Sequence, residues 1–418
     1  MKNLKVFKVA TKYIVRSKKH KLLMIAIGCV TFFIIVGKGY QLGLKKQIDY
    51  LQYYGYTGDF IIVNSNVRPK SKPEFLNVEK DEMLCYEHLK FKLLEKFYNQ
   101  IEYILPRYVT KSMVMGKDEE TCEYITLLGV NFADEYKVGI FKLFNFISLS
   151  LEHKEDGIYV SNKIAKKLNL ELGSNVYCFI ITKGEMPKPA KFIVEGIFES
   201  KGFPALVDFL CCVEFEKLNK ILKNGNKKCS YIQIILKNKS DINSKIVEIE
   251  KALTNSYSLY NFKKAAPFFD NIKKAIDITS FGSLLFQYVA VFLFIYSSIY
   301  MLIIAKKNEV AIMYTLGLST KEVILFFLTG VSILILSPAL IGMICGLIVN
   351  YIFSIIGIPA LNEAMKYMFA SDRLYFDFNI LLSISIVVMI TIVGIFASLI
   401  PLVSIKKIDV REQLQRQI

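Results

Sequence analysis

Residues 323–349 read VILFFLTGVSILILSPALIGMICGLIV and contain no charged side chain. An α-helix rises about 1.5 Å per residue, so about 20 apolar residues cross the hydrocarbon core of a bilayer. Uncharged runs of this length are rare among the buried helices of soluble proteins. The stretch therefore predicts a membrane-spanning helix, and it decides the fold class of the whole chain.

Three further apolar runs have the same character, and the first of them is the weakest because Lys38 interrupts it. A basic segment before a short apolar stretch also describes a cleaved signal peptide, and Gly37-Lys38-Gly39 resembles a cleavage site. We favour an uncleaved anchor, since the run is long enough to cross and Lys38 can reach the interface. The four spans are expected at 22–44, 278–305, 323–350 and 380–405.

Basic residues near the spans predict the orientation, because they are retained on the cytoplasmic side. Residues 1–21 hold eight lysines and arginines and no acid, and their apolar spacing predicts an amphipathic helix in the cytoplasmic interface. The net basic segments 306–322 and 406–418 are also placed in the cytoplasm, whereas 45–277 and the net acidic loop 351–379 are placed outside. Much of the net charge of +16 therefore meets anionic lipid, and no nucleic-acid partner is expected.

The large segment 45–277 has the patterns of an α/β domain. Runs rich in β-branched and aromatic residues predict strands, and a helix over 242–253 between two of them predicts a βαβ unit. Ser161 is expected to cap a short helix over 161–170, with Gly173 at its C-terminal cap. The predicted fold is an α-helical membrane protein with four transmembrane helices and a two-lobed α/β (α+β) extracytoplasmic domain between helices 1 and 2. The strands are expected at 60–63, 124–128, 176–182, 191–198, 231–236 and 257–262.

The sequence lacks the residue clusters that catalysis, metal binding or ion coupling require. Its three histidines are far apart, its eight cysteines form no CxxC pair, and it has no phosphate-binding loop. Disulfides between the cysteines of 45–277 stay possible in an oxidising compartment. No ionisable residue lies within the second, third or fourth span, although an ion-coupled transporter usually needs one. No catalytic, cofactor or metal site is expected, and energy for transport has to come from a partner.

The third span carries a proline and a pair of small residues. Pro338 removes a backbone hydrogen bond and predicts a bend in the helix. Gly342 and Gly346 form a small-xxx-small face that suits close helix packing. Glycines are also simply common in membrane helices, so both readings of this pair stay open.

The segment 306–322 has the pattern of a short amphipathic helix that presents side chains to a cytoplasmic partner. An acid lies at its start, where the helix dipole favours it, and apolar residues follow at spacings of three and four. A glycine then suits a left-handed helix end. The alternative is a plain basic loop that only sets the topology. The residues assigned to this ATPase-coupling segment are Glu309, Val310, Met313, Tyr314, Leu316 and Gly317.

Three stretches resemble the FtsX-like permease family, which includes the lipoprotein-releasing (Lol) and macrolide-exporter (MacB) permeases. They are KKNEVAIMYTLGLS at 306–319, PLVSIKKIDVREQL at 401–414, and DGIYVSNKIAKKLNLELG at 156–173 with FIVEGIF at 192–198. Val410 stands where the family usually has a proline. The resemblance extends along the whole chain, in order, and is closest to the lipoprotein-releasing subunits LolC and LolE.

The resemblance implies a permease subunit in the bacterial inner membrane, with cytoplasmic termini. It implies a second permease subunit, either a copy or a sister, and a cytoplasmic ABC ATPase dimer that uses the ATP. The expected function is release of lipoproteins toward the outer membrane, with a lipoprotein substrate and a periplasmic carrier as further partners. The alternatives are a MacB-like exporter of small molecules or peptides and an FtsX-like regulator of wall hydrolases. A different class is a membrane-anchored ligand receptor or enzyme.

Overall fold

The computed structural model describes residues 18–69, 75–116, 121–150, 155–182, 186–200, 207–225, 227–253 and 256–403. The chain divides into two compact units. The first, here the helical unit, comprises Met1–Gly43, Ile276–Ile358 and Tyr375–Ile418; the second, here the α/β unit, comprises Leu44–Ala275 and Pro359–Leu374. Most of the amphipathic helix expected at 1–21, and all of the tail at 406–418, lie outside the described residues.

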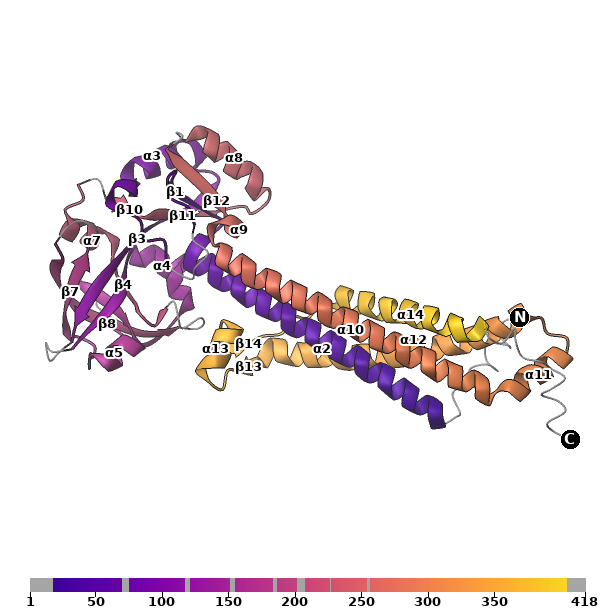
Figure 1. Cartoon of the computed structure of the whole chain (residues 1–418). Coiled ribbons are helices and arrows are strands. Elements are labelled where there is room, and N and C mark those ends of the chain that lie inside the picture. Colours follow the sequence, from indigo (N-terminus) through magenta and orange to yellow (C-terminus); the bar gives the residue numbers. More distant parts are fainter. Residues whose placement is uncertain are drawn as a thin grey trace. The chain divides into compact units, whose positions relative to one another are not determined.

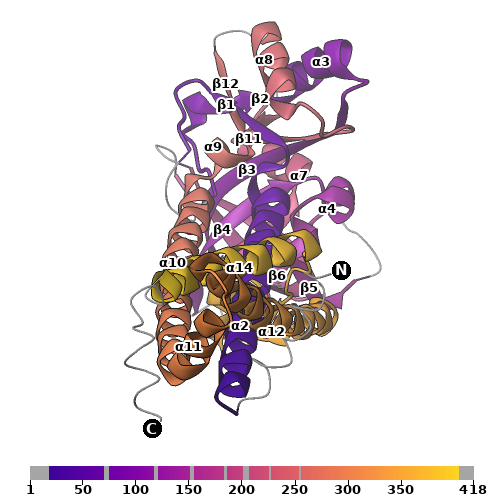
Figure 2. The same cartoon turned by 90° about the vertical axis from the view of Figure 1, so that its right-hand side faces the viewer.

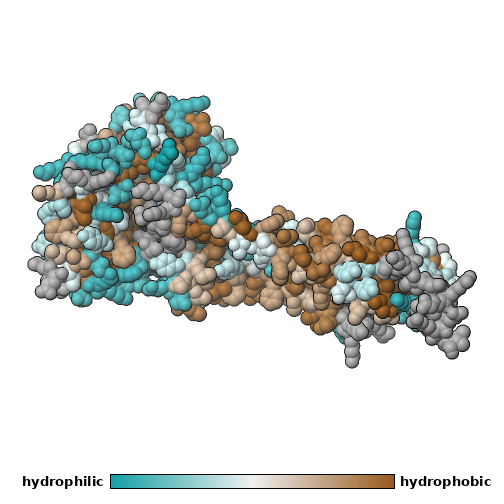
Figure 3. All heavy atoms as spheres, viewed as in Figure 1, coloured by the Kyte–Doolittle hydropathy of each residue, from teal (hydrophilic) through white to brown (hydrophobic). Residues whose placement is uncertain are grey.

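Four long apolar helices among the described residues confirm the predicted membrane class. Each is long and apolar enough to cross a bilayer, and the surface that they present is predominantly hydrophobic (Figure 3). Two of them continue well beyond the apolar runs, because the polar residues after 44 and before 278 are also acceptable in a helix. These helices are α2 (Lys18–Gln52), α10 (Pro267–Ala305), α12 (Thr320–Ile356) and α14 (Ile380–Val403), labelled in Figure 1.

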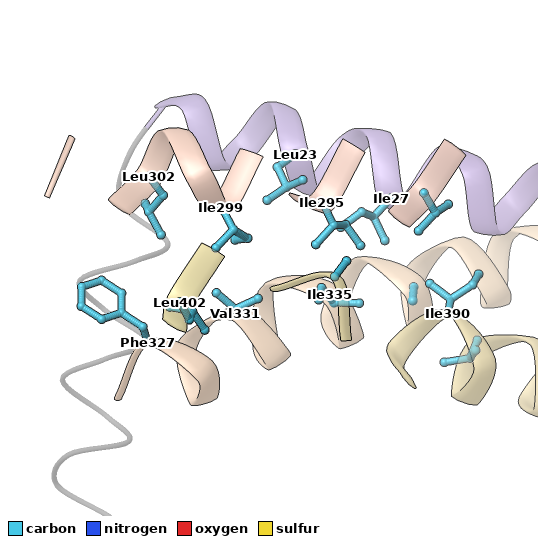
Figure 4. Packing of buried hydrophobic residues seen from close by; sticks show 14 of the residues in the cluster. Leu23, Ile27, Ile295, Ile299, Leu302, Phe327, Val331, Ile335, Ile390 and Leu402 are labelled. Carbon is cyan, nitrogen blue, oxygen red and sulfur yellow. The ribbon is translucent and has the colours of Figure 1, made fainter. Parts of the chain in front are cut away.

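Aliphatic side chains from all four helices form the core of the helical unit (Figure 4). On α12 the buried residues recur at every fourth position, which keeps them on one face of the helix. Val323, Phe327, Val331 and Ile335 belong to this row. They meet buried residues of the other helices, including Ile27 of α2. The packing of one apolar stripe against its neighbours therefore defines the bundle.

The backbones of α2 and α12 approach each other closely at small residues. A Cβ atom placed on Gly342 would lie 2.3 Å from the carbonyl oxygen of Gly28. A Cβ on Gly346 would lie 3.0 Å from Ile35 Cγ2. Pro338 lies in the same interface, since its carbonyl oxygen is 3.3 Å from the Cβ position of Gly28. The small residues therefore allow a helix contact that larger side chains would prevent.

Six strands of the α/β unit close into a ring. Strand β3 pairs with β4, β4 with β9, β9 with β6, β6 with β8, β8 with β7, and β7 again with β3. Each of these strands therefore pairs with a ring neighbour on either side along part of its length, which reduces the exposed strand edges. The strands are β3 (Ile101–Met115), β4 (Cys122–Val130), β6 (Gly157–Ser161), β7 (Asn175–Ile181), β8 (Lys188–Ser200) and β9 (Leu210–Glu214), with β5 (Phe144–Leu149) added beside β8.

The second lobe continues from the first through β3, which pairs with β11 along its first half and with β4 along its second (Figure 2). Strand β1 lies between β11 and β12 and is antiparallel to both. The expected βαβ unit is therefore split, because β1 separates its two strands. The elements are β1 (Phe60–Asn64), α3 (Tyr86–Phe97), β11 (Tyr231–Leu236), α8 (Ile242–Ala252), β12 (Tyr257–Asn261) and α9 (Phe262–Ala265).

The remaining elements are short. One two-stranded sheet joins β2 and β10, and another joins β13 and β14 around α13. The π-helical turn η1 (Tyr53–Thr57) follows α2 directly. These elements are η2 (Lys80–Glu82), β2 (Leu84–Cys85), α4 (Phe132–Val138), η3 (Ile140–Leu143), α5 (Asn162–Lys167), α7 (Phe215–Leu222), β10 (Lys228–Cys229), β13 (Ile358–Pro359), α13 (Glu363–Phe369) and β14 (Arg373–Leu374).

Ser161 caps α5 as predicted, since its side chain accepts a hydrogen bond from the Ile164 amide. The prediction for Gly173 is wrong. The helix ends at Lys167, and Asn169 takes the left-handed conformation with φ of 49°. Gly173, with φ of 82°, lies in the next turn and donates to the Val194 carbonyl. Asparagine tolerates this conformation, so the helix stops before the glycine.

A buried ion pair joins the two lobes and the turn after α2. Arg107 of β3 and Glu135 of α4 lie 3.1 Å apart, with both side chains fully buried. The Arg107 guanidinium also donates to Gln233 Oε1 at 2.8 Å, and Glu135 accepts from the Ile140 amide at 2.6 Å. Gln233 in turn donates to the Tyr53 carbonyl. Breaking this network by removing one charge leaves the other buried and unpaired.

We expect Glu135→Ala to lower the free energy of unfolding of the α/β unit by about 3–5 kcal/mol, because Arg107 loses its buried carboxylate. Pulse proteolysis of the full chain in detergent, across a urea series, measures this change. The control is Lys167→Ala, which removes an exposed pair with Glu123 and should leave the urea midpoint unchanged. Equal midpoints for the two variants would contradict the role given to the buried pair.

We expect Gly342→Ala to destabilise the helical unit by about 1–3 kcal/mol, because the added methyl group cannot fit against the Gly28 carbonyl without a backbone shift. The matched control is Gly37→Ala in α2, whose Cβ would meet nothing within 4 Å. Alanine is the better helix former, so this control should be neutral or stabilising. Unfolding in detergent micelles measures both, and equal stabilities would refute the close contact.

Candidate functional site

The link between α10 and α12 holds a separate short helix, α11 (Lys307–Thr315). Lys306 interrupts the helical path before it, with φ of −108° and ψ of 14°. Its ammonium group pairs with Glu309 in the first turn of α11, at 2.6 Å. Burial raises the pKa of Glu309 and lowers the pKa of Lys306. Each charge is therefore partly removed from water, and the ion pair compensates for that loss.

The C-terminus of α11 is fixed by a glycine-dependent turn. Gly317 has φ of 81°, a conformation that costs other residues about 1–2 kcal/mol. The Gly317 amide donates to the Tyr314 carbonyl at 3.0 Å, and the Leu318 amide donates to the Met313 carbonyl at 3.2 Å. These two bonds form a Schellman motif. Gly317 thus lies where the sequence placed the helix end.

The next helix begins almost at once, with a capping box. The Ser319 amide donates to Glu322 Oε2 at 2.8 Å, and the Glu322 amide donates to Ser319 Oγ at 3.4 Å. Sequence reasoning missed this pair, although serine followed three residues later by glutamate is its recognised signature. Only Gly317 and Leu318 separate the cap residue of α11, Leu316, from the cap residue of α12. The link therefore has little freedom.

One face of α11 packs on the helical unit itself. Val310 and Ala311 are fully buried, and Val310 belongs to the core cluster. Met313 and Tyr314 are partly buried and pack against the same cluster. The residues that the sequence spacing grouped together, Val310, Met313 and Tyr314, therefore anchor α11 to its own chain. Glu309 lies at the edge of this face.

The other face of α11 exposes apolar side chains. Leu316 is 76% exposed, and Ile312 and Leu318 are also exposed. Ile312 and Leu316 are four residues apart, so they lie on one side of the helix. Sequence reasoning singled out Leu316 and missed Ile312 and Leu318. For Ile312 a signal was present, because it lies four residues before Leu316. Exposed apolar residues grouped in this way are typical of protein or membrane contacts.

The other predicted residues lie in the helix interface and not at this segment. Pro338, Gly342 and Gly346 are buried in α12, against α2. Within the described ranges, no group of three His, Cys, Asp or Glu side chains is arranged to hold a metal ion. All eight cysteines are described, and each is free.

Comparisons with known proteins place this segment in a family region. The model of the FtsX-like permease C-terminal region matches residues 281–410, less than a third of the chain, with α11 inside it. No curated protein matches significantly.

Solved structures are also similar to part of the chain, and three of them are named here. They are the extracellular domain of the noncanonic ABC-type transporter YknZ from Gram-positive bacteria (15% identity, 48% of this chain and 100% of that chain, TM-score 0.31), the periplasmic region of MacB from Actinobacillus actinomycetemcomitans (12%, 53% and 94%, 0.33), and a domain of a putative permease from Porphyromonas gingivalis (13%, 51% and 95%, 0.28). The resemblance to the FtsX-like permeases noted in the sequence is confirmed at residues 281–410, where the family model matches.

Proposed function

We propose that this chain is the non-catalytic permease subunit of an ATP-driven ABC system. A separate cytoplasmic ATPase dimer hydrolyses ATP, and its movement passes through the helical unit to the α/β unit. The observation that carries the proposal is the match of the permease C-terminal model to residues 281–410, the region that contains α11. A second permease subunit, a copy or a sister, completes the assembly.

The construction of α11 supports a mechanical role. A segment that transmits force has to bind the partner on one side and be held rigidly against its own chain on the other. A flexible loop would absorb the displacement. Val310 fixes α11 to the helical core, and the turn at Gly317 fixes its end. Ile312, Leu316 and Leu318 remain available on the opposite side. An ATPase with an apolar recess fits this surface.

The proposed orientation follows from charge. Basic residues at both ends of the chain and in 306–322 favour the cytoplasm for these segments. The α/β unit then lies outside the inner membrane. Helices α2 (Lys18–Gln52) and α10 (Pro267–Ala305) each contain residues of both units, so they are two continuous helical connections through which movement can reach the α/β unit.

Within this class we propose lipoproteins as the substrate, taken from the outer leaflet of the inner membrane and passed to a periplasmic carrier. The choice rests on the resemblance noted in the sequence, which is closest to the lipoprotein-releasing subunits. MacB-like export and regulation of wall hydrolases are the outcomes from which the substrate experiment has to distinguish it.

We expect Leu316→Asp to abolish binding of the ATPase, because a charge in an apolar interface is left without a partner when it is desolvated. The tagged chain is purified from its own host in mild detergent, and co-purifying proteins with a phosphate-binding loop are identified and quantified. The control is Leu361→Asp, the same change at an exposed leucine in the loop between α12 and α14. Retention of the ATPase by Leu316→Asp, or no ATPase with the unmodified chain, would contradict the proposal.

We expect the assembled complex to release a triacylated lipoprotein from proteoliposomes in an ATP-dependent manner. A fluorescent lipoprotein is co-reconstituted, and its appearance in the soluble fraction with an acceptor protein is measured. The matched control is the same polypeptide carrying a single transmembrane helix in place of its acyl chains, which should stay in the membrane. ATPase stimulation by small molecules, with no lipoprotein release, would favour the export alternative instead.

A further inference from the structure

A groove of about 620 Å³ runs along the helical unit between α2 and α12. Glycines lie on its floor, at Gly28 and Gly342, and larger apolar side chains form its walls, among them Ile25 and Phe33. Ile25 and Phe33 are both exposed. Among the described residues that line the groove, Lys21 is the only charged one. The groove is therefore apolar along its length and basic at one end.

The close helix contact explains why the groove exists. Because Gly28 and Gly342 have no side chains, the backbones approach and leave a shallow floor. Cys29 and Cys345, which are small, widen the space beside it. Larger residues on either side then project past the floor. The groove is a consequence of the same packing that holds α2 against α12.

The dimensions of the groove correspond to one leaflet of a bilayer. Along α2 it extends from Lys21 to Phe33, which is about 18 Å at the rise of an α-helix. The hydrocarbon core of a bilayer is about 30 Å thick, so this length is close to half of it. Lys21 lies at the end of the apolar run, and Lys18 and Lys19 precede it in the sequence. A basic group therefore lies where the headgroups of that leaflet lie.

We propose that this groove is a binding site for an anionic phospholipid, with an acyl chain between α2 and α12 and the headgroup phosphate at Lys21. The apolar lining suits a hydrocarbon chain, and the positive charge at its end suits an anionic headgroup. A helix from a second copy fits less well. It is about 10 Å across, and the glycines that permit close helix contact are already used between α2 and α12. The inference rests on the apolar helices and is independent of the ATPase.

The test uses the absence of tryptophan from the chain. Phe33→Trp places a single fluorophore in the wall of the groove, and Phe396→Trp on α14 is the matched control. The two phenylalanines are 64% and 63% exposed, but Phe396 does not line the groove. Each full-length variant is reconstituted in phosphatidylcholine vesicles with a minor fraction of phosphatidylglycerol. Bromine on the acyl chains of one lipid or the other quenches the nearby fluorophore.

At position 33 we expect brominated phosphatidylglycerol to quench about fivefold more effectively than its bulk fraction predicts. The reason is that one lysine near a membrane surface contributes about 1 kcal/mol to the attraction of anionic lipid. At position 396 quenching should follow the bulk fractions. Lys21→Ala should remove the preference at position 33. If Phe33→Trp does not fold, Ile25→Trp reports on the same wall.

Three results would overturn the proposal. Quenching that follows bulk composition at both positions would show that no lipid site exists. If both brominated lipids quench position 33 by the same excess, and Lys21→Ala does not change this excess, the groove binds lipid without selecting an anionic headgroup. Protection of position 33 from both lipids would show that protein covers the groove. A Cys29–Cys29 disulfide formed by mild oxidation would then identify a second copy.

Discussion

The contact between the backbones of α2 and α12 is the constraint on which the helical unit depends. Gly28 and Gly342 permit it, and Gly346 and Ile35 continue it along the pair. Further along, Asn350 donates to the Ile35 carbonyl at 3.0 Å. Helices in lipid gain little from burying apolar area against each other, so close van der Waals contact and such hydrogen bonds determine which pairs form. The position of α12 then determines where α11 is anchored.

Polar side chains in the apolar helices are mostly satisfied within their own helix. Thr31 and Ser337 each donate to the carbonyl four residues earlier, at 2.8 Å, as a medium without water requires. Lys38 has a partner on a neighbouring helix, because its ammonium group donates to Ser280 Oγ of α10; its expected reach to the interface stays a prediction. A lysine in the first apolar run is thus compatible with a spanning helix, since a neighbouring helix supplies its partner.

The parts of the fold that could be predicted are those determined by local pattern. The apolar runs marked the four helices, and β-branched runs marked strands such as β1 and β11. Strand β3 was missed, because Pro106 and Arg107 interrupt its apolar pattern and proline argues against a central strand. Ring closure was also beyond prediction, since it joins β3 to β7 through pairings of residues distant in sequence, such as Met113 with Phe179. Neither strand β3 nor the closure of the ring is therefore marked by a pattern within a short stretch of sequence.

The same limit explains what was predictable at α11 and what was not. Its inward residues, such as Val310, and its outward residues, Ile312 and Leu316, have the same helical spacing. Periodicity therefore predicts a helix but does not say which side meets the core. Only the packing of α12 decides it, because Val310 lies in the core cluster with Val323 and Phe327. In the proposed mechanism, a displacement applied at Leu316 reaches the N-cap of α12 through two intervening residues. A helix anchored on neither side would move without pulling on the bundle.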